Sequence, residues 1–125
     1  MNYINELNNF RIVTSNIKIK HGPQSLWFLL MHICNRSGWK EWINASNNYI
    51  SEELGCTEKT MFKWRDILID KGFIIYKSQR RKRNSGEYKL VSMSVLLEQL
   101  SINSTVKITV DEEKSPQTTV KNTVE

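Results

Sequence analysis

The stretch SNNYISEELGCTEKTMFKWRDILIDKG, residues 46–72, predicts two short helices joined by a tight turn. It opens on Ser46, Asn47 and Asn48, whose side chains accept hydrogen bonds from the free amides at a helix start. They predict a short helix over residues 49–54. Gly55 is expected to end that helix, because glycine readily takes the left-handed backbone conformation that follows many helices.

A second helix is predicted after about three residues. Thr57 is its expected N-cap, and Glu58 lies in the first turn, where the helix dipole favours an acid. The helix runs to Gly72, and two helices with a glycine at the bend have the spacing of a helix-turn-helix motif. Its expected core stripe consists of Met61, Trp64, the aliphatic stem of Arg65, and Leu68.

After Gly72 the hydrophobic period changes from that of a helix to that of a strand. Residues 73–78 alternate between apolar and polar side chains, and residues 88–91 predict a second strand. Asn84-Ser85-Gly86 is the turn signal between them. With the helix pair, this hairpin predicts a mainly α fold with a small β-hairpin, a winged helix-turn-helix.

Three elements are predicted upstream of the motif. Residues 3–15 place apolar side chains at three- and four-residue steps and predict a short amphipathic helix. The sequence HGPQ is expected to interrupt the chain, with Pro23 suited to a first helical turn. Residues 24–35 then predict a central buried helix that ends at Gly38, and residues 41–44 predict a short strand.

The C-terminal part of the chain has a different composition. Residues 95–100 predict one more short helix. Residues 104–125 hold the related units TVKITV and TVKNTV and no aromatic side chain. Such a segment cannot offset the entropy of ordering it, which predicts a flexible polar tail or linker. We therefore expect a domain over residues 1–92, a connector or short helix over residues 93–103, and this tail.

Positive charge is concentrated in one part of the chain. The formal net charge is +5, but residues 57–89 alone hold ten Lys or Arg against four Asp or Glu. Residues 101–125 hold three basic side chains against four acidic ones. A local excess of this kind indicates a phosphate-binding surface rather than general solubility.

The densest part of this excess is the run Arg80, Arg81, Lys82 and Arg83. Charge runs are often solvated loops, and some are nuclear address tags. An address tag belongs in a flexible tail, whereas this run lies between two predicted strands. Contact with phosphates or the minor groove of DNA is the better interpretation beside a cationic helix.

The helix over residues 57–71 presents Lys59, Thr60, Lys63 and Asp66 opposite its core stripe. Lys59 and Lys63 are expected to meet phosphates or guanine edges, and Thr60 a thymine methyl group or a phosphate. Asp66 lies farther along and is expected to be solvated. The pattern predicts a DNA-facing surface and assigns no base to any one residue.

Phe62 and Ile69 belong to neither face of that helix. Seven residues apart, they form a second apolar stripe that needs a cover. We expect residues 3–13 to cover it in part, and a dimer of the chain is the alternative.

Other classes of function have little support. Cys34 and Cys56 are isolated thiols, and His32 and Cys34 diverge by about 200° on a helix, which argues against a shared metal ion. Neither His21 nor His32 has a paired acid or nucleophile, and no Gly-rich phosphate loop occurs. We expect no enzyme activity, no cofactor and no metal.

The sequence also argues against a membrane protein. No apolar run reaches the roughly 18 residues that a membrane span requires, and the N-terminus lacks a cationic start followed by an apolar block. The expected location is the cytoplasm.

Four segments of the chain carry a resemblance to a known family. MNYINELNNF, LWFLLMHICNRSGW, LGCTEKTMFKWRDILIDKGFI and YKSQRRKRNSGEYKL resemble the N-terminal winged-helix domain of DnaD-like and phage replisome-organiser proteins of Gram-positive bacteria and their phages. The similarity spans about residues 1–91. It is most specific at LMHI followed by GW and at the closing KGFI.

The resemblance implies a domain that binds double-stranded DNA, self-associates and helps to start replication in a bacterial host. By matching position, the implied DNA-contacting residues are Lys59, Thr60, Lys63, Arg80, Arg81, Lys82 and Arg83. Members of that family usually continue, after a polar linker, into a second helical domain. Contact with a replicative helicase or its loader would depend on that region.

The sequence leaves two alternatives beside a replication initiator of a phage or mobile element. One is a winged-helix transcriptional regulator. The other is a self-associating scaffold that uses the same fold only for protein contacts. Steep salt dependence of DNA affinity would separate DNA binding from the scaffold.

Overall fold

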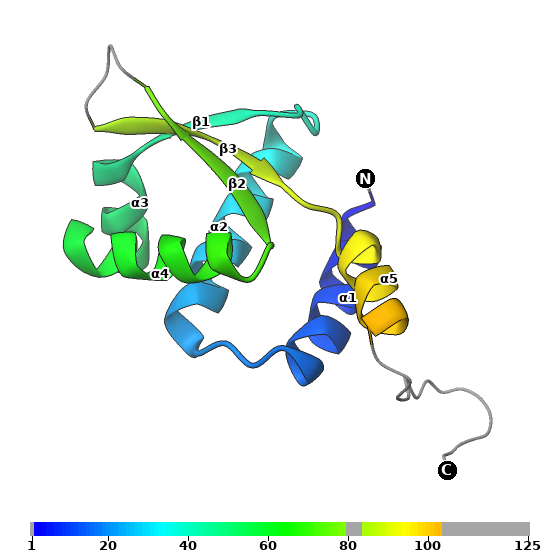
Figure 1. Ribbon diagram of the computed structural model, residues 1–125. Helices are drawn as coiled ribbons and strands as arrows, with labels where there is room; N and C mark the ends of the chain where they lie inside the picture. Colours follow the sequence, from blue (N-terminus) through cyan, green and yellow to red (C-terminus); the bar gives the residue numbers. More distant parts are fainter. Residues whose placement is uncertain (1, 80–83, 104–125) are drawn as a thin grey trace. The chain divides into compact units, whose positions relative to one another are not determined.

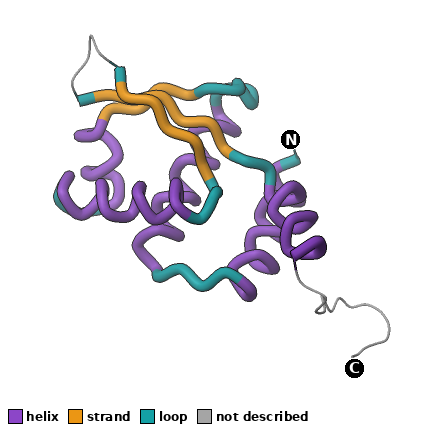
Figure 2. Tube along the Cα trace, viewed as in Figure 1, coloured by secondary structure: helices purple, strands orange, loops and turns teal. Residues whose placement is uncertain are grey.

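The computed structural model describes residues 2–79 and 84–103, with side chains up to residue 101. Its elements follow one another as α1 (Tyr3–Asn16), α2 (His21–Arg36), β1 (Ile43–Ser46), α3 (Asn47–Leu54), α4 (Glu58–Asp70), β2 (Ile74–Ser78), β3 (Ser85–Leu90) and α5 (Met93–Asn103) (Figures 1 and 2). The chain divides into two units after Met93, and each is described by itself. The predicted order of elements and the mainly α winged helix-turn-helix fold are confirmed.

Helix α2 is the centre of the core. Leu26, Trp27 and Leu30 are fully buried, and the helix contacts α3, α4 and β3. This follows from its sequence, because apolar side chains occupy most of its circumference and must be covered on several sides at once.

Helix α1 packs on α2 through one aromatic side chain. The ring of Phe10 stacks on that of Trp27, with centroids 3.8 Å apart and planes 7° from parallel. It also makes edge contacts with Phe28 and Phe73, at 5.3 and 5.8 Å. Burial of Phe10 therefore fixes the N-terminal helix to the core.

The three strands form one antiparallel sheet in the order β1-β3-β2. In the central strand, Gly86, Tyr88 and Leu90 are buried, whereas Glu87 and Lys89 on the other face are partly exposed. Tyr88 pairs with Ile43 on one side and Tyr76 on the other. This alternation places one face of the hairpin on the helices and leaves the other toward solvent.

Three sequence-based boundaries were wrong. Strand β1 covers Ile43–Ser46 rather than residues 41–44, because Ile43 and Ala45 are the side chains that turn into the core. Helix α2 begins at His21, so the HGPQ sequence forms its first turn instead of a break. Pro23 is tolerated there because its missing N–H has no partner in a first turn.

The third wrong boundary concerns the hairpin. Ser85 and Gly86, predicted as turn residues, belong to β3 because Ser46 and Ala45 of β1 pair with them. Pairing with β1 thus extends β3 toward its N-terminal end. The sequence of the hairpin alone could not predict this, because β1 lies elsewhere in the chain.

The other predicted helices are present, although α3 begins at Asn47 rather than at residue 49, because Ser46 alone is its N-cap. Helices form where residues 3–15 and 95–100 predicted them, and α5 extends over Met93–Asn103. No helix within residues 2–79 and 84–103 is long and apolar enough to span a bilayer. The predicted tail, residues 104–125, lies outside the described residues.

Candidate nucleic-acid interface

The turn between α3 and α4 has the geometry that the sequence predicted. Gly55 adopts φ 67° and ψ 36°, the left-handed region, and its N–H donates to the carbonyl of Glu52. Thr57 then caps α4, since its Oγ1 accepts from the N–H of Thr60 at 3.1 Å. Glycine is favoured at position 55 because any other L-residue would be strained at this φ.

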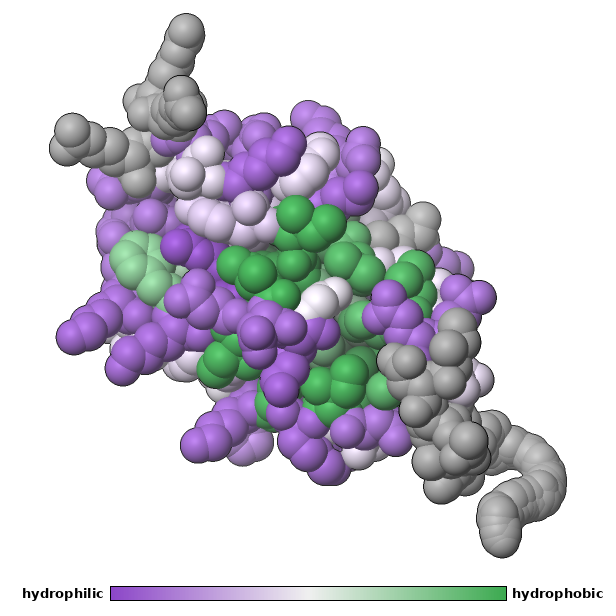
Figure 3. Space-filling view, in the orientation of Figure 1, coloured by the Kyte–Doolittle hydropathy of each residue, from purple (hydrophilic) through white to green (hydrophobic). Residues whose placement is uncertain are grey.

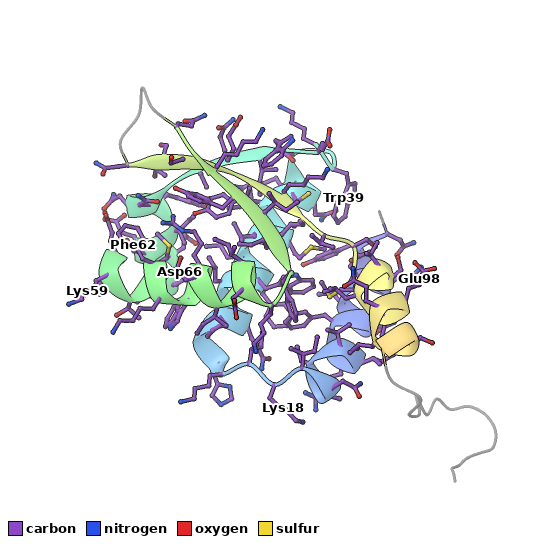
Figure 4. The ribbon with its side chains drawn as sticks, in the orientation of Figure 1. Lys18, Trp39, Lys59, Phe62, Asp66 and Glu98 are labelled. Atoms are coloured by element: carbon purple, nitrogen blue, oxygen red, sulfur yellow. The ribbon has the colours of Figure 1, made fainter. Side chains whose placement is uncertain are left out.

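The predicted DNA-facing residues of α4 lie on its solvent side. Lys59, Lys63 and Asp66 are exposed, and Thr60 is half-buried with its hydroxyl accepting a hydrogen bond from the Thr57 hydroxyl at 3.0 Å. Figure 4 shows Lys59 at the N-terminal end of α4, pointing away from the protein. Thr60 therefore also takes part in the cap of α4.

Charge is distributed unevenly along α4. The exposed lysines, Lys59 and Lys63, lie in the N-terminal half of the helix, whereas the exposed acids, Asp66 and Asp70, lie in the C-terminal half. A phosphate backbone is attracted to the first half and repelled by the second. Glu58 in the first turn and the exposed Lys71 just after the last turn weaken this difference between the two halves.

The basic run at residues 80–83 lies outside the described residues, but both of its neighbours are placed. The N–H of Gln79 donates to the carbonyl of Ser85 at 3.3 Å, and the carbonyl of Asn84 accepts from the N–H of Asn47 at 2.6 Å. The start of α3 thus holds the end of the hairpin close to the helix-turn-helix.

The structure reveals a role for Arg65 that sequence reasoning missed. The guanidinium, expected to lend only its stem to the core, lies over the rings of Tyr76 and Phe62, with Cζ 4.0 and 4.8 Å from their centroids. Nη1 donates to Oδ1 of Asn47 at 3.4 Å and to the hydroxyl of Tyr88 at 3.2 Å. One side chain of α4 thus contacts α3 and both strands of the hairpin.

The hydroxyl of Tyr88 is well shielded from water at this junction. Burial raises the pKa of Tyr88, since water that would solvate the phenolate is excluded, and the Arg65 hydrogen bond lowers it by less. Tyr88 is therefore neutral at physiological pH and accepts from Arg65 as a phenol.

The outer face of the sheet carries a second group of cations. Nζ of Lys77 lies 4.2 Å and Nζ of Lys89 5.9 Å from the ring centroid of Trp42. Lys89 also donates to a carboxylate oxygen of Glu41 at 2.8 Å, and this hydrogen bond and charge lower the pKa of Glu41. Because the pair is solvent-exposed, its contribution to stability is small.

The second apolar stripe of α4 is partly exposed. Ile69 is 39% exposed, Phe62 lies under the Arg65 guanidinium, and Phe10 of α1 makes its ring contacts with Trp27, Phe28 and Phe73. Figure 3 shows apolar surface in the middle of this view of the molecule. Cover of the stripe by residues 3–13, or by a second copy of the chain, stays a prediction.

No site for a metal or a reactive thiol stands out among the described residues. Within residues 2–79 and 84–103, no three His, Cys, Asp or Glu side chains gather as a ligand set. Burial raises the pKa of both Cys34 and Cys56, which disfavours the reactive thiolate.

Comparison with known proteins agrees with this geometry. Residues 23–74 match the model of a family described as a helix-turn-helix domain. The matched segment runs from the first turn of α2 to the first residue of β2 and includes the turn at Gly55. No curated protein matches the chain. The match and the fold together support a helix-turn-helix domain that binds DNA.

Proposed function

We propose that this winged helix-turn-helix domain binds double-stranded DNA during replication initiation of a phage or mobile element. The observation that carries DNA binding is the helix-turn-helix itself, with exposed Lys59 and Lys63 on the first turns of α4. The resemblance of residues 1–91 to DnaD-like and replisome-organiser proteins supports the replication role. The proposal involves no catalytic chemistry and places the protein in the bacterial cytoplasm.

The charge pattern of α4 defines how the helix would meet the duplex. Its N-terminal half would enter the major groove, as in many helix-turn-helix proteins, and Lys59 and Lys63 would contact phosphates or base edges there. Asp66 and Asp70 would keep the C-terminal half away from the backbone. Arg80, Arg81, Lys82 and Arg83 would add contacts to phosphates or the minor groove.

Salt-dependent binding to duplex DNA tests the proposal. If the seven site residues contact phosphates, the logarithm of affinity should fall linearly with the logarithm of salt concentration, by about 0.9 per contact. An affinity that does not change with salt would contradict DNA binding through these residues and would favour a scaffold that uses the fold for protein contacts.

Footprinting separates replication from transcription. Protection of the element's own replication origin would support initiation, whereas protection confined to promoters would support a winged-helix regulator. Measurement of solution mass on the same sample would show whether the chain self-associates. The family resemblance further predicts contact with a replicative helicase or its loader, through the region that follows the domain in its relatives.

A further inference from the structure

Arg65 is the side chain through which the recognition helix, α4, is connected to the hairpin. Its guanidinium contacts the ring of Tyr76 on β2, the hydroxyl of Tyr88 on β3 and the amide oxygen of Asn47 on α3. Two of these partners, Tyr88 and Asn47, are almost completely buried. The connection therefore lies between α4 and the sheet rather than on the surface.

Arg65 is partly buried, and its charge has no ion-pair partner among the described residues. In the part of the chain that the structure describes, the ion pair of Lys89 with Glu41 is the only one, and Nε of Arg65 is buried without a hydrogen-bond partner. A methionine or leucine would fill the same space without that desolvation penalty. Packing alone therefore does not explain an arginine here, whereas its flat, many-donor head does connect three elements at once.

Two further contacts extend the effect of Arg65 to the start of β3. Tyr76 lies so close to Gly86 on the neighbouring strand that a Cβ atom at Gly86 would overlap its ring. Asn47, which accepts from Arg65, donates its backbone N–H to the carbonyl of Asn84. Asn84, which follows the basic run, and Gly86 on β3 are thus connected, through Asn47 and Tyr76, to one side chain of α4.

We propose that Arg65 is a positioning residue that sets the angle between α4 and the β2–β3 hairpin, so that the cations of both elements meet one duplex. This inference rests on the proposed DNA binding. Without the Arg65 contacts, β2 and β3 would still pair with each other, but the direction of this hairpin relative to α4 would vary. The four cations that follow β2 would then contribute little to a fixed complex.

The substitution Arg65→Lys tests this proposal because it keeps the charge and removes the planar head with its several donors. We expect Arg65→Lys to lower the salt slope of duplex binding by about two to four, the amount expected for up to four lost phosphate contacts at about 0.9 each. Arg36→Lys, an exposed arginine in the last turn of α2, is the matched control and should leave the slope unchanged.

A double-mutant comparison separates positioning from general damage. Replacing residues 80–83 by alanine in the Arg65→Lys background should lower the slope little further, because the hairpin cations no longer contribute. Lys63→Ala in the same background should lower it by about 0.9 more, since the helix contact is independent. Circular dichroism should show the wild-type helix content for each variant.

Each outcome decides the proposal. The role of Arg65 would be overturned if Arg65→Lys left the salt slope unchanged. It would also be overturned if the reductions in slope caused by Arg65→Lys and by alanine at residues 80–83 simply added. Either result would leave DNA binding intact. A wild-type protein that does not bind duplex DNA would overturn both proposals. If Arg65→Lys does not fold, Tyr76→Leu replaces it, and additive losses there would overturn the proposal equally.

Discussion

The indole of Trp64 on α4 lies directly against the backbone of Gly22 in the first turn of α2. A Cβ atom at Gly22 would overlap the indole ring, so only glycine leaves room for this approach. This contact holds α4 against the first turn of α2. That turn is the HGPQ sequence, which was predicted to interrupt the chain. Trp64 is partly buried, whereas Met61 and Leu68 on the same helix are fully buried.

Substitution of Gly22 by alanine should therefore destabilise the domain, although alanine is the better helix former by about 1 kcal/mol. Forcing a methyl group against the indole should cost about 1–3 kcal/mol, measured by urea unfolding. Ser25→Ala, at an exposed position of the same helix, should change stability by less than about 0.5 kcal/mol. A Gly22→Ala protein as stable as the wild type would show that α4 can move away without loss.

Glu6 of α1 should stabilise the fold through its hydrogen bonds with Ser92 and Met93. Its carboxylate is 5% exposed and accepts from the N–H of Met93 at 2.8 Å and from the hydroxyl of Ser92 at 2.9 Å. Glu6→Ala would leave the N–H of Met93 without this acceptor, and we expect a loss of about 1–3 kcal/mol in thermal or urea unfolding.

The matched variant for this position is Glu6→Gln, which retains a carbonyl oxygen in the same place. It should lose less stability than Glu6→Ala, because an acceptor for the N–H of Met93 remains. It should still lose some stability, because that acceptor is neutral instead of charged. Equal losses for the two variants would show that packing of the side chain, and not its hydrogen bonds, is what matters at this position.

Tyr88 gives the stability of the domain a dependence on alkaline pH. Since burial raises its pKa in the folded state above the ordinary value of about 10, the folded protein holds the phenol proton more tightly than the unfolded chain. The contribution is therefore complete below about pH 10 and should be lost as pH rises through the folded pKa.

Comparison of wild type with Tyr88→Phe isolates this effect from the titration of lysines. Below pH 10 the phenylalanine variant should be less stable by about 1 kcal/mol, the value of the lost hydrogen bond with Arg65. In urea unfolding between about pH 8 and 11, the advantage of the wild type should shrink as pH rises. A constant difference over this range would contradict the raised pKa.

Replacing a lysine of α4 should weaken DNA binding more than replacing an exposed lysine elsewhere. Lys63→Ala should reduce the salt slope of duplex binding by about 0.9 and weaken binding to all sequences, as the loss of one phosphate contact would. Lys40→Ala is the control, because Lys40 is exposed and lies between α2 and β1, outside α3 and α4. Equal effects of the two substitutions would indicate non-specific attraction to a basic protein.

Several elements could be predicted from the sequence because local chemistry determines them. The side chains of Ser46 and Thr57 satisfy free amides within three residues, so the starts of α3 and α4 could be predicted. Gly55 could be identified as the turn residue because the left-handed backbone is nearly reserved for glycine. The exposure of Lys59 and Lys63 followed from the same helical period.

The position of Arg65 could not be predicted in this way. Its spacing from Met61 and Leu68 places it at the edge of the core stripe, which fits either a buried stem or an exposed cation. Its actual partners, Tyr76, Tyr88 and Asn47, are 11, 23 and 18 residues away in sequence. Contacts over such separations depend on how the sheet is packed, and no local period encodes them.

The order of the elements, the caps and turn of the helix-turn-helix, and the concentration of positive charge could be predicted because each depends on neighbours a few residues apart. The pairing of β1 with β3, the contact of Trp64 with Gly22, and the contacts of Arg65 with both strands of the hairpin depend on how the chain packs in three dimensions. These contacts form only when the burial of α2 brings distant segments together, since water would otherwise compete for each of them.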